Sequence, residues 1–567
     1  MAANLFQTKS LEQLTGDADK SKGLKKTLTA LDLTLLGIGA IIGTGIFVLT
    51  GTAAANQAGP AITISYIMAG LACGFAALCY AEFASMIPVA GSAYTYAYAT
   101  LGEVVAWMIG WDLILEYAVG SMTVAIGWSG NFQRVIHGLF DVTLPTWMQA
   151  GPGILPGAVV NLPAVIIVLL MMILLVVGVR ESARFNAVMV AVKLLAVLIF
   201  LGVAFTKVRP ENWQPYAPYG WSGIMGAAAV VFFAYIGFDA VSTTAEEAKN
   251  PQRDLPIGII ASLGICTALY IAVAAVLSGI VHVTEYRSLE AALPGAPIQA
   301  AEEVTKFLNA PVGYVLGSLH IGWADTLVSF GAVAGITSVL LVMLMSQPRI
   351  FFSMSRDQLL PPGISKVHPK FGTPYITTII TCVIVALVAG LTRIEVVGEM
   401  TSIGTLFAFV IVCAAVMVLR KTRPDVKRPF TAPGGPVTPI LGVISCSYLM
   451  LSLAVLTWVR FLVWLDIGML IYWFYSRTHS PLFNAAAEAK KSSGERTGDF
   501  LTMWGGVGLF NGFWILVVGL MTVLGITGET TAKWHEVHIT AEQACMLGVA
   551  ALVVGGGMFM AGRPKKT

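Results

Sequence analysis

Charged residues are scarce in this chain of 567 residues: Asp, Glu, Lys and Arg make up 11% of it, against about a quarter of an ordinary soluble protein. Hydrophobic residues make up 56% and lie in long blocks. So few polar side chains could not cover the surface of a soluble fold of this size. The composition therefore excludes a set of soluble domains and indicates that lipid surrounds most of the chain.

Loop cysteines, metal-ligand spacings and nucleotide-binding motifs are also missing. The seven cysteines fall inside apolar blocks, which argues against both a disulfide framework and a metal cluster. The chain has no P-loop, and the HExH run at 535–538 lacks the HExxH spacing of zinc enzymes. A net charge of +3 gives no reason to expect a nucleic-acid partner. We therefore expect no enzyme, no metal and no cofactor.

Apolar stretches long enough to cross a bilayer, about 20 residues each, predict fourteen membrane-spanning helices. The stretch 281–323 is too long for a plain turn and is expected to carry short helices on one membrane face. The spans are expected at 31–54, 60–86, 95–129, 157–178, 184–206, 220–247, 255–280, 324–352, 372–392, 398–419, 437–457, 458–476, 501–525 and 541–561.

The positions of Lys and Arg predict the orientation of these spans. Of the 34 Lys and Arg residues, 25 lie in segments that would be cytoplasmic if the N-terminus is inside, eight lie outside, and Lys193 lies within a span. Both termini are therefore expected in the cytoplasm. The first span is long enough to be a permanent helix, so we expect a multi-pass protein of the cell (plasma or inner) membrane.

The first span has an unusual run of glycines at 37–47, GIGAIIGTGIF, which weakens a helix. One interpretation is a helix-packing face formed by Gly39 and Gly43. The sharper one is a helix that unwinds in mid-membrane at 43–45. Non-helical backbone at that depth is tolerated only where it lines a cavity or is buried in protein.

The sixth span contains a counterpart, FFAYIGFDA at 232–240, with Gly237 and Asp239 near its middle. Asp239 is a candidate cap for a second half-helix. Spans one and six each begin a group of five, and paired interrupted helices at matching positions of two repeats indicate a transporter binding site.

Ionisable residues inside spans are costly and need a partner or a task. Asp112 and Glu116 are four residues apart in span three and share one helix face, while Lys193 lies midway along span five. One hypothesis is a structural ion pair between these two spans. The other is that Glu116 lies beside a substrate and that Lys193 carries the coupling charge. Asp466 in span twelve is interpreted as structural.

Several of these motifs together resemble the amino acid–polyamine–organocation superfamily of permeases, and within it the cationic amino acid transporter branch. Besides the glycine run, they include GWDLILEY at 110–117 and FAYIGFD at 233–239. The others are YAEFASMIPVAGSAY at 80–94, EEAKNP at 246–251 with Pro256, and PR at 348–349 with SRD at 355–357. The resemblance extends over about 30–480, and fourteen spans are similar to the eukaryotic-type members.

The resemblance implies a LeuT-like core of two inverted five-helix repeats, followed by four additional C-terminal helices, that works by alternating access. The expected organisation is a cytoplasmic segment 1–30, repeats at 31–206 and 220–420, spans eleven and twelve at 437–478, a cytoplasmic linker at 479–500 and the last pair at 501–562.

The resemblance also implies a site for an amino acid. The carboxylate would meet the unwound backbone, the ammonium would meet backbone carbonyls, Glu116 would border the pocket, and span eight would touch the side chain. The residues so implied are Ile41, Gly43, Thr44, Gly45, Glu116, Phe233, Ala234, Ile236, Ile336 and Thr337. Lys193 falls where related transporters bind sodium, so protons are expected as the coupling ion.

We therefore predict a proton-coupled amino-acid importer. The substrate stays open between cationic amino acids such as arginine or lysine and small neutral ones such as alanine. An obligate exchanger is the alternative within transport, and a membrane amino-acid sensor is the alternative from another class. The expected partners are the amino acid, protons and membrane lipids. The sequence leaves open whether a small membrane protein or a second copy of the chain is a partner.

Overall fold

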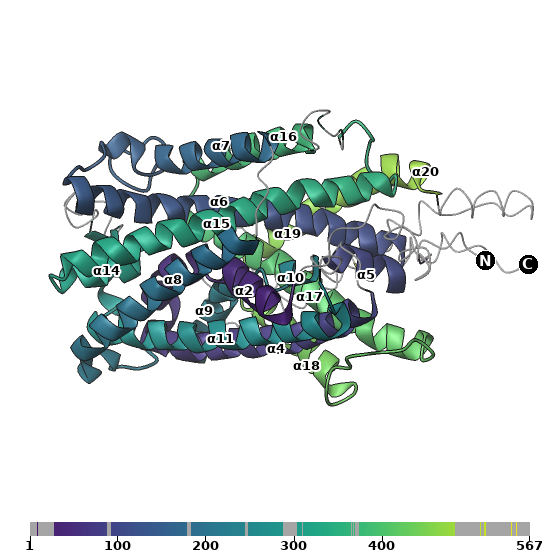
Figure 1. The fold of residues 1–567 in the computed structure, drawn as a ribbon, viewed down its shortest axis with the longest axis horizontal. Coiled ribbons are helices and arrows are strands. Elements are labelled where there is room, and N and C mark those ends of the chain that lie inside the picture. The colour runs from purple at the N-terminus through teal and green to yellow at the C-terminus, as the bar shows by residue number, and fades with distance from the viewer. Residues whose placement is uncertain are drawn as a thin grey trace, which may run out of the picture.

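A computed structural model of the chain describes residues 28–87, 92–177, 183–243, 248–286, 310–364 and 373–481, with short pieces at 303–308 and a few isolated positions. Its regular elements in these ranges are all helices, apart from one bridge between Leu28 and Ala248 (Figure 1). The predicted all-α class is thus confirmed. The predicted linker and last two spans lie almost wholly outside the described residues.

Seven of the described helices are long and apolar enough to cross a membrane, and five shorter ones are also apolar. Each of the first twelve predicted spans overlaps such a helix. The main elements are α2 (Ala30–Ile41), η1 (Gly45–Leu49), α3 (Thr50–Ala53), η2 (Ala54–Ala58), α4 (Ile62–Met86), α5 (Ser92–Thr100), α6 (Glu103–Phe140), α7 (Leu162–Val177), α8 (Ala183–Ala204), α9 (Gly220–Val231), η7 (Phe232–Tyr235), α10 (Ala240–Thr243), α11 (Pro251–Ile280), α14 (Pro311–Ser318), α15 (Gly322–Arg356), α16 (Tyr375–Leu391), α17 (Ile394–Thr422), α18 (Val437–Leu451) and α19 (Val455–Ile471).

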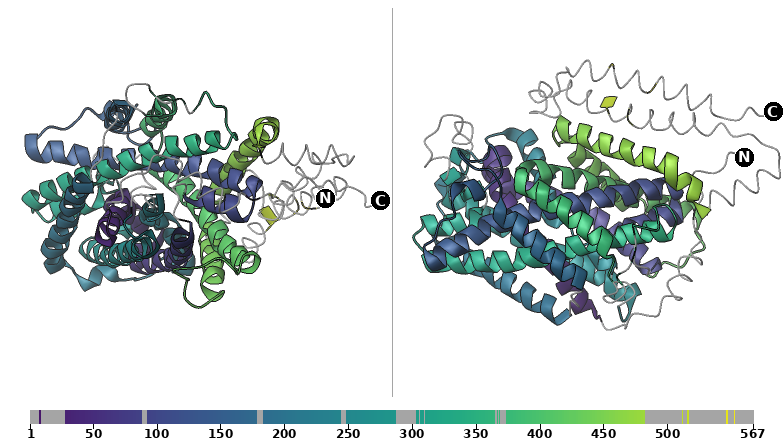
Figure 2. Two further views of the ribbon diagram at one scale, coloured as in Figure 1. Left: turned by 45° about the vertical axis from the view of Figure 1, so that its right-hand side comes forward. Right: turned by 90° about the horizontal axis from the view of Figure 1, so that it is seen from above.

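The longest helices pack against one another in two groups. α6 packs along α15 and α17, while α11 packs along α4 and α2 (Figure 1). α7 and α16 pair at one edge, and the yellow-green α19 runs along another edge (Figure 2). Large apolar side chains stay exposed on these outer helices, such as Leu170 and Leu387. Because a water-soluble surface rarely carries such a belt, these faces fit contact with lipid tails.

Two boundaries differ from the predicted spans. The third span, expected as one helix over 95–129, is divided at Gly102 into α5 and α6. Gly102 has φ of +99°, which glycine adopts at low cost and other residues do not. Spans eleven and twelve are separated at 452–454 rather than at 457. The stretch 281–323 does contain a short helix, α14, as predicted.

The start of α2 is fixed by a capping box. The Thr29 hydroxyl accepts a hydrogen bond from the Asp32 backbone N–H at 3.4 Å, and the Asp32 carboxylate accepts one from the Thr29 backbone N–H at 2.9 Å. Two N–H groups that the first helical turn leaves without partners are satisfied in this way. The box sets where the first span begins, and hence where its glycine run lies in the bundle.

Candidate functional site

The first span is broken near its middle. α2 ends at Ile41, Ile42 turns away with an extended ψ of 104°, and helical structure resumes at Thr44 and continues as the π-helix η1. The predicted interruption is therefore present, but it begins at Ile42, and Gly45 already belongs to the second half. The first N–H groups of that half have no helical acceptors, as at any helix start.

The sixth span is broken as well, and the two breaks touch. α9 tightens into the 3₁₀ turn η7, and a turn at 236–239 separates η7 from α10. A Cβ atom on Gly45 would overlap the backbone of Ala234 in η7. Gly237 has φ of +115°, and a Cβ atom on it would lie 2.8 Å from the Ala40 carbonyl oxygen. The glycines thus let two interrupted backbones meet directly.

Lys193, on α8, reaches the end of α2. Its side chain is fully buried, and its amine donates hydrogen bonds to the carbonyl oxygens of Gly39 at 2.6 Å and Ile42 at 2.8 Å. The last carbonyls of a helix lack helical donors, so the amine satisfies groups that the break exposes. The ion pair considered between Lys193 and Asp112 or Glu116 is absent, because the amine bonds to these two carbonyls, and both oxygens of Asp112 and Oε1 of Glu116 have no hydrogen-bond partner.

Tyr270, on α11, joins the two broken helices. Its buried hydroxyl lies 2.9 Å from the Ile41 carbonyl oxygen and 2.8 Å from the Ala234 carbonyl oxygen. A tyrosine hydroxyl carries one hydrogen and can donate to one of these at a time. Each carbonyl oxygen has two lone pairs, so both keep the capacity to accept a further donor such as a ligand ammonium group.

Two buried carboxylates follow one face of α6, as their spacing predicts. Glu116 is 2% exposed and one of its oxygens, Oε1, has no hydrogen-bond partner; both oxygens of the fully buried Asp112 lack one. Asp112 lies against Gly404 of α17, where a Cβ atom would be 2.7 Å from its Oδ1. Nearby, the Tyr117 hydroxyl lies 3.5 Å from Asp239 Oδ2. The carboxylate of Asp239, in the turn of the second break, therefore lies beside the turn of α6 that carries Glu116.

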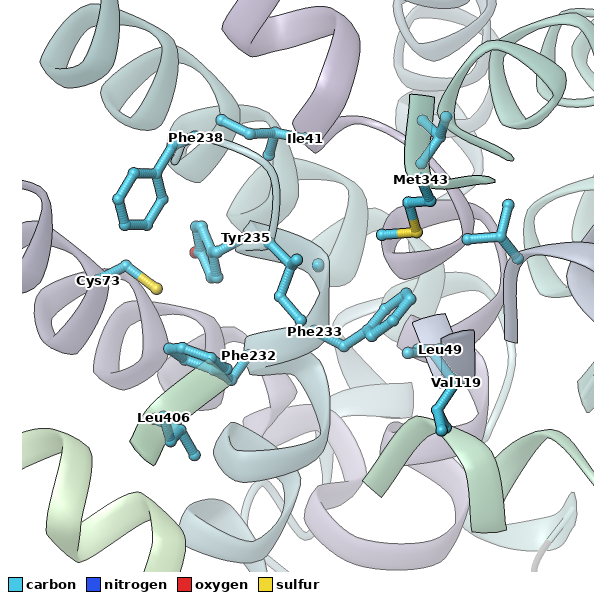
Figure 3. Close-up of a cluster of buried hydrophobic side chains, with 14 of the residues drawn as sticks. Ile41, Leu49, Cys73, Val119, Phe232, Phe233, Tyr235, Phe238, Met343 and Leu406 are labelled. Carbon is cyan, nitrogen blue, oxygen red and sulfur yellow. The ribbon is translucent and has the colours of Figure 1, made fainter. Parts of the chain in front are cut away.

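Apolar side chains cover much of the remaining wall. Figure 3 shows Phe233 of η7 directed toward Leu49 of η1 and Val119 of α6, with Met343 of α15 nearby, and all are buried. A Cβ atom on Gly43 would lie 3.0 Å from a methyl group of Val339 on α15. A ligand at the break would therefore place its side chain mainly among hydrocarbon groups.

The two predicted contacts from span eight lie on the same helix, α15. Ile336 is fully buried. The Thr337 hydroxyl accepts a hydrogen bond from the Trp128 ring N–H at 2.8 Å and donates to the Val333 carbonyl oxygen at 2.6 Å. Thr337 is therefore held in place by two partners, whereas Ile336 offers only its hydrocarbon surface.

Thr44 differs from its neighbours because its hydroxyl is buried and has no hydrogen-bond partner. A Cβ atom on Gly127 of α6 would overlap its methyl group, so the side chain fits closely against α6. A buried polar atom without a partner costs free energy. The Thr44 hydroxyl is thus able to bond to a polar atom of a ligand; its role in binding stays a prediction.

Sequence reasoning missed Tyr270, Trp128 and Val339. Each lies in an apolar span and shows no motif of its own. Only the position of its hydroxyl in the middle of span seven could have marked Tyr270 as a candidate, because polar groups at membrane depth need hydrogen-bond partners. Which partners it would find depends on how the helices pack. The role of the predicted contacts in binding a ligand stays a prediction.

Comparison with known proteins identifies the family. The family described as "Amino acid permease" matches residues 28–476, most of the chain. The chain belongs to this family. The resemblance drawn from the sequence motifs is thereby confirmed, and both broken helices fall inside the matched region. The match points to a multi-pass membrane transporter rather than an enzyme.

Several curated relatives of this permease carry transporter names. It is 49% identical to the branched-chain amino acid permease BcaP of Bacillus subtilis over 85% of this chain and 100% of that protein. It is 46% identical to the methylthioribose transporter of the same organism, over 85% of this chain and 99% of the relative. The vacuolar cationic amino acid transporter 4 of Arabidopsis thaliana is 39% identical, over 71% of this chain and 64% of the relative.

Proposed function

We propose that this permease imports amino acids across the cell membrane by alternating access, coupled to protons. The observation that carries the proposal is the meeting of two interrupted helices, with a buried lysine amine on the carbonyls of one of them. Paired half-helices are a recurring way to bind small ions and zwitterions in the membrane. The named relatives include transporters of branched-chain and of cationic amino acids, which fits this substrate class.

In this proposal the first ten spans form two inverted five-helix repeats, spans eleven to fourteen lie outside that core, and both termini are cytoplasmic. The match to the amino acid permease family ends at residue 476, so the last two predicted spans lie beyond it. The pairing of a break in span one with a break in span six supports the repeat, because each opens a group of five.

The carboxylate and ammonium groups of the bound amino acid are recognised by peptide groups of the protein in the two breaks. The N–H groups at Gly43, Thr44 and Gly45 begin a half-helix and attract the carboxylate. The carbonyl oxygens near Ile41 and Ala234 attract the ammonium group. The Tyr270 hydroxyl, which already bonds to these carbonyls, would share them with the ammonium group. The carbonyls of Phe233 and Ile236 complete this side of the proposed site.

Lys193 supplies the coupling charge. When protonated, its amine holds α8 against the end of α2 through the Gly39 and Ile42 carbonyls. An amine, unlike a guanidinium group, can lose its proton, so we infer that Lys193 releases its proton once these contacts open. Loss of the proton lets the two helices separate and the substrate leave inward.

The test is uptake into proteoliposomes with an imposed pH gradient, with and without sodium. Wild-type protein should concentrate substrate along the proton gradient and ignore sodium. Lys193→Ala should lose concentrative uptake, and Lys193→Arg should not restore it, because arginine stays charged at any relevant pH. Sodium-dependent uptake that ignores the pH gradient would end this mechanism, as would an alanine variant that concentrates substrate normally.

The substrate class depends on Glu116. The apolar wall of Phe233, Val119 and Met343 favours a neutral, apolar side chain. The unpartnered Oε1 of Glu116 favours the second candidate, a cationic amino acid. A thermal-shift screen of the purified protein against the twenty amino acids separates the two, since only bound ligands stabilise.

We expect Glu116→Gln to change the preference between arginine and alanine, because it removes the charge and keeps the size. Competition uptake of both amino acids, measured in the variant and in wild type, gives this ratio. An equal loss for both, together with a lower melting temperature, would assign Glu116 a structural role instead.

Two alternatives remain testable with the same preparation. An obligate exchanger would show counterflow without net uptake. A sensor would bind amino acids and transport none.

A further inference from the structure

One buried phenylalanine ring of α17 contacts span six on both sides of its break. The ring centroid of Phe409 lies 5.5 Å from that of Phe232 and 5.0 Å from that of Phe238. Phe232 precedes Gly237, where the span is interrupted, and Phe238 follows it. Figure 3 shows these two rings on either side of Tyr235. Both separations lie within the range of about 4.5–7 Å that aromatic pairs prefer, so Phe409 bridges the break.

A tyrosine of α4 completes this aromatic contact. The ring centroid of Tyr80 lies 5.4 Å from that of Phe409 and 5.7 Å from that of Phe238, and both pairs are edge-on. Each of these three rings therefore contacts the other two. Lipid tails are as apolar as the rings, so helices in a membrane associate through close packing rather than through burial alone. The packing of the three rings holds the residue after Gly237 between α4 and α17.

Gly237 lets the chain turn, but it does not select the angle of the turn. Its φ of +115° is one of several values that glycine adopts at low cost, so contacts of the neighbouring residues must select it. On one side the Tyr270 hydroxyl bonds to the Ala234 carbonyl oxygen at 2.8 Å, and Gly237 lies against the Ala40 carbonyl. On the side of α17, Phe409 contacts the break. The directions of the peptide groups at 233–236 therefore depend on packing from both sides.

We propose that Phe409 is a positioning residue of the central site, the amino-acid site proposed above between the two breaks. The ring keeps the two sides of Gly237 at one angle, and so holds the carbonyl groups at 233–236 in directions from which they share one ammonium group. A site that is already ordered binds more tightly, because binding then costs less conformational entropy. The inference rests on the proposed function, which assigns these carbonyls to the substrate.

Phe409→Leu and Phe407→Leu form a matched pair of variants. Phe407 lies two residues earlier on the same helix, so it faces another side, and its ring contacts Phe461 of α19 with the centroids 5.5 Å apart. Both rings are buried, at 3% exposed for Phe407 and 1% for Phe409, so both variants should lose similar stability. Phe409→Met is the conservative variant, because a thioether makes favourable contacts with aromatic rings and leucine does not.

The first measurement follows the break without any ligand. Hydrogen exchange of the backbone amides in a peptide covering 230–240, measured by mass spectrometry on the purified protein, reports local opening. Phe409→Leu should raise the exchange rate there by about tenfold, the equivalent of one or two aromatic contacts. Phe409→Met should lie between this variant and wild type, and Phe407→Leu should match wild type. Equal exchange in the two leucine variants would overturn the proposal.

The second measurement is the Kd of the amino acid that most stabilises wild type, taken from thermal-shift titrations of the same preparations. The Kd should rise about tenfold in Phe409→Leu, recover in part in Phe409→Met, and stay within about twofold of wild type in Phe407→Leu. An unchanged Kd in Phe409→Leu, or an equal rise in both leucine variants, would overturn the proposal. If Phe409→Leu does not fold, Phe409→Met is compared with Phe407→Met by the same two measurements.

The two measurements also separate this inference from the proposed function. If wild type binds none of the twenty amino acids, and exchange at 230–240 still responds only to changes at Phe409, the role of Phe409 in holding the break is retained and the proposed transport is rejected.

Discussion

The hydroxyl of Tyr270 is a single group shared by both broken helices, so its removal should affect binding as well as stability. Tyr270→Phe leaves the Ile41 and Ala234 carbonyls without this donor, which should cost about 1–3 kcal/mol of folding free energy. We also expect weaker amino-acid binding. Thermal unfolding and ligand-induced thermal shifts, measured on the purified protein, give the two effects separately.

Tyr235→Phe is the matched control. Its buried hydroxyl donates to the Tyr66 carbonyl oxygen at 2.8 Å, which is not one of the carbonyls that we propose bind the ligand. This variant should lose similar stability and keep its ligand-induced shift. If both variants lose the shift equally, Tyr270 acts through packing alone.

At the level of single residues, the sequence pointed to Lys193, Glu116 and the glycine run because each violates a rule for membrane helices. It could not indicate what Lys193 contacts: the amine lies on the Gly39 and Ile42 carbonyls, and these exist as free acceptors only because α2 ends there. Val339 and Trp128 obey every rule for apolar spans, so no local pattern separates them from the residues around them.

The two broken helices depend on each other through Gly45. A Cβ atom there would overlap the Ala234 backbone, and backbone cannot move aside as a flexible side chain can. We therefore expect Gly45→Ala to push η1 and η7 apart and to lower the melting temperature by several degrees, with loss of ligand binding. Size-exclusion profiles and thermal unfolding of the detergent-purified variant would measure this.

Gly43 provides the contrast at the same break. The three atoms nearest to a Cβ atom on it all belong to the Val339 side chain, and the closest is a methyl group at 3.0 Å. Gly43→Ala should therefore fold, and the bulkier Gly43→Val should fold but bind no amino acid, since the backbone must approach the carboxylate closely. Gly43→Ala with Val339→Ala should recover packing. Amino-acid binding retained by Gly43→Val would refute the proposed central site.

At the level of elements, hydropathy located the helices better than it located their ends. Twelve predicted spans overlap apolar helices, because spanning a bilayer fixes both length and composition. The division between α5 and α6 was missed, since the residues on both sides of Gly102 are apolar enough to continue one helix. The positive φ of Gly102 is a backbone property that hydropathy does not record.

At the scale of the whole molecule, a buried carboxylate connects helices that are far apart in the sequence. Glu82 at the end of α4 accepts hydrogen bonds from two nitrogens of Arg420 on α17 and from the Ala432 backbone N–H at 2.8 Å, and Arg428 Nε lies 3.6 Å away. The carboxylate is fully buried, while the arginines are mostly covered. The end of α4, the last turns of α17 and the loop that follows α17 are therefore joined at this side chain.

Glu82→Gln should destabilise the protein by about 3 kcal/mol, because it leaves two arginines without their counter-charge in a partly buried place. Arg423→Gln is the control, since its pair with Asp425 is 3.5 Å long and largely exposed and should matter little. Thermal unfolding of both variants in the same detergent decides this. Equal melting temperatures would mean that the Glu82 cluster adds nothing to stability.

Asp466 likewise connects segments that are distant in the sequence. Both of its oxygens accept hydrogen bonds from Asn511, at 2.8 and 3.0 Å. This contact joins α19 to a residue of the predicted thirteenth span, in agreement with the structural role inferred for Asp466 from the sequence.

The amine of Lys193 is attached to the chain by its own four-carbon stem, and this has a consequence for the conditions under which the protein can work. A diffusible ion occupies its site in proportion to its concentration in the medium, but a tethered group has a fixed effective concentration at the carbonyls of Gly39 and Ile42. Dilution cannot remove it, and added salt cannot displace it. The presence of the amine at the end of α2 is thus independent of the salinity of the surroundings, whereas its charge in our proposal follows the proton concentration.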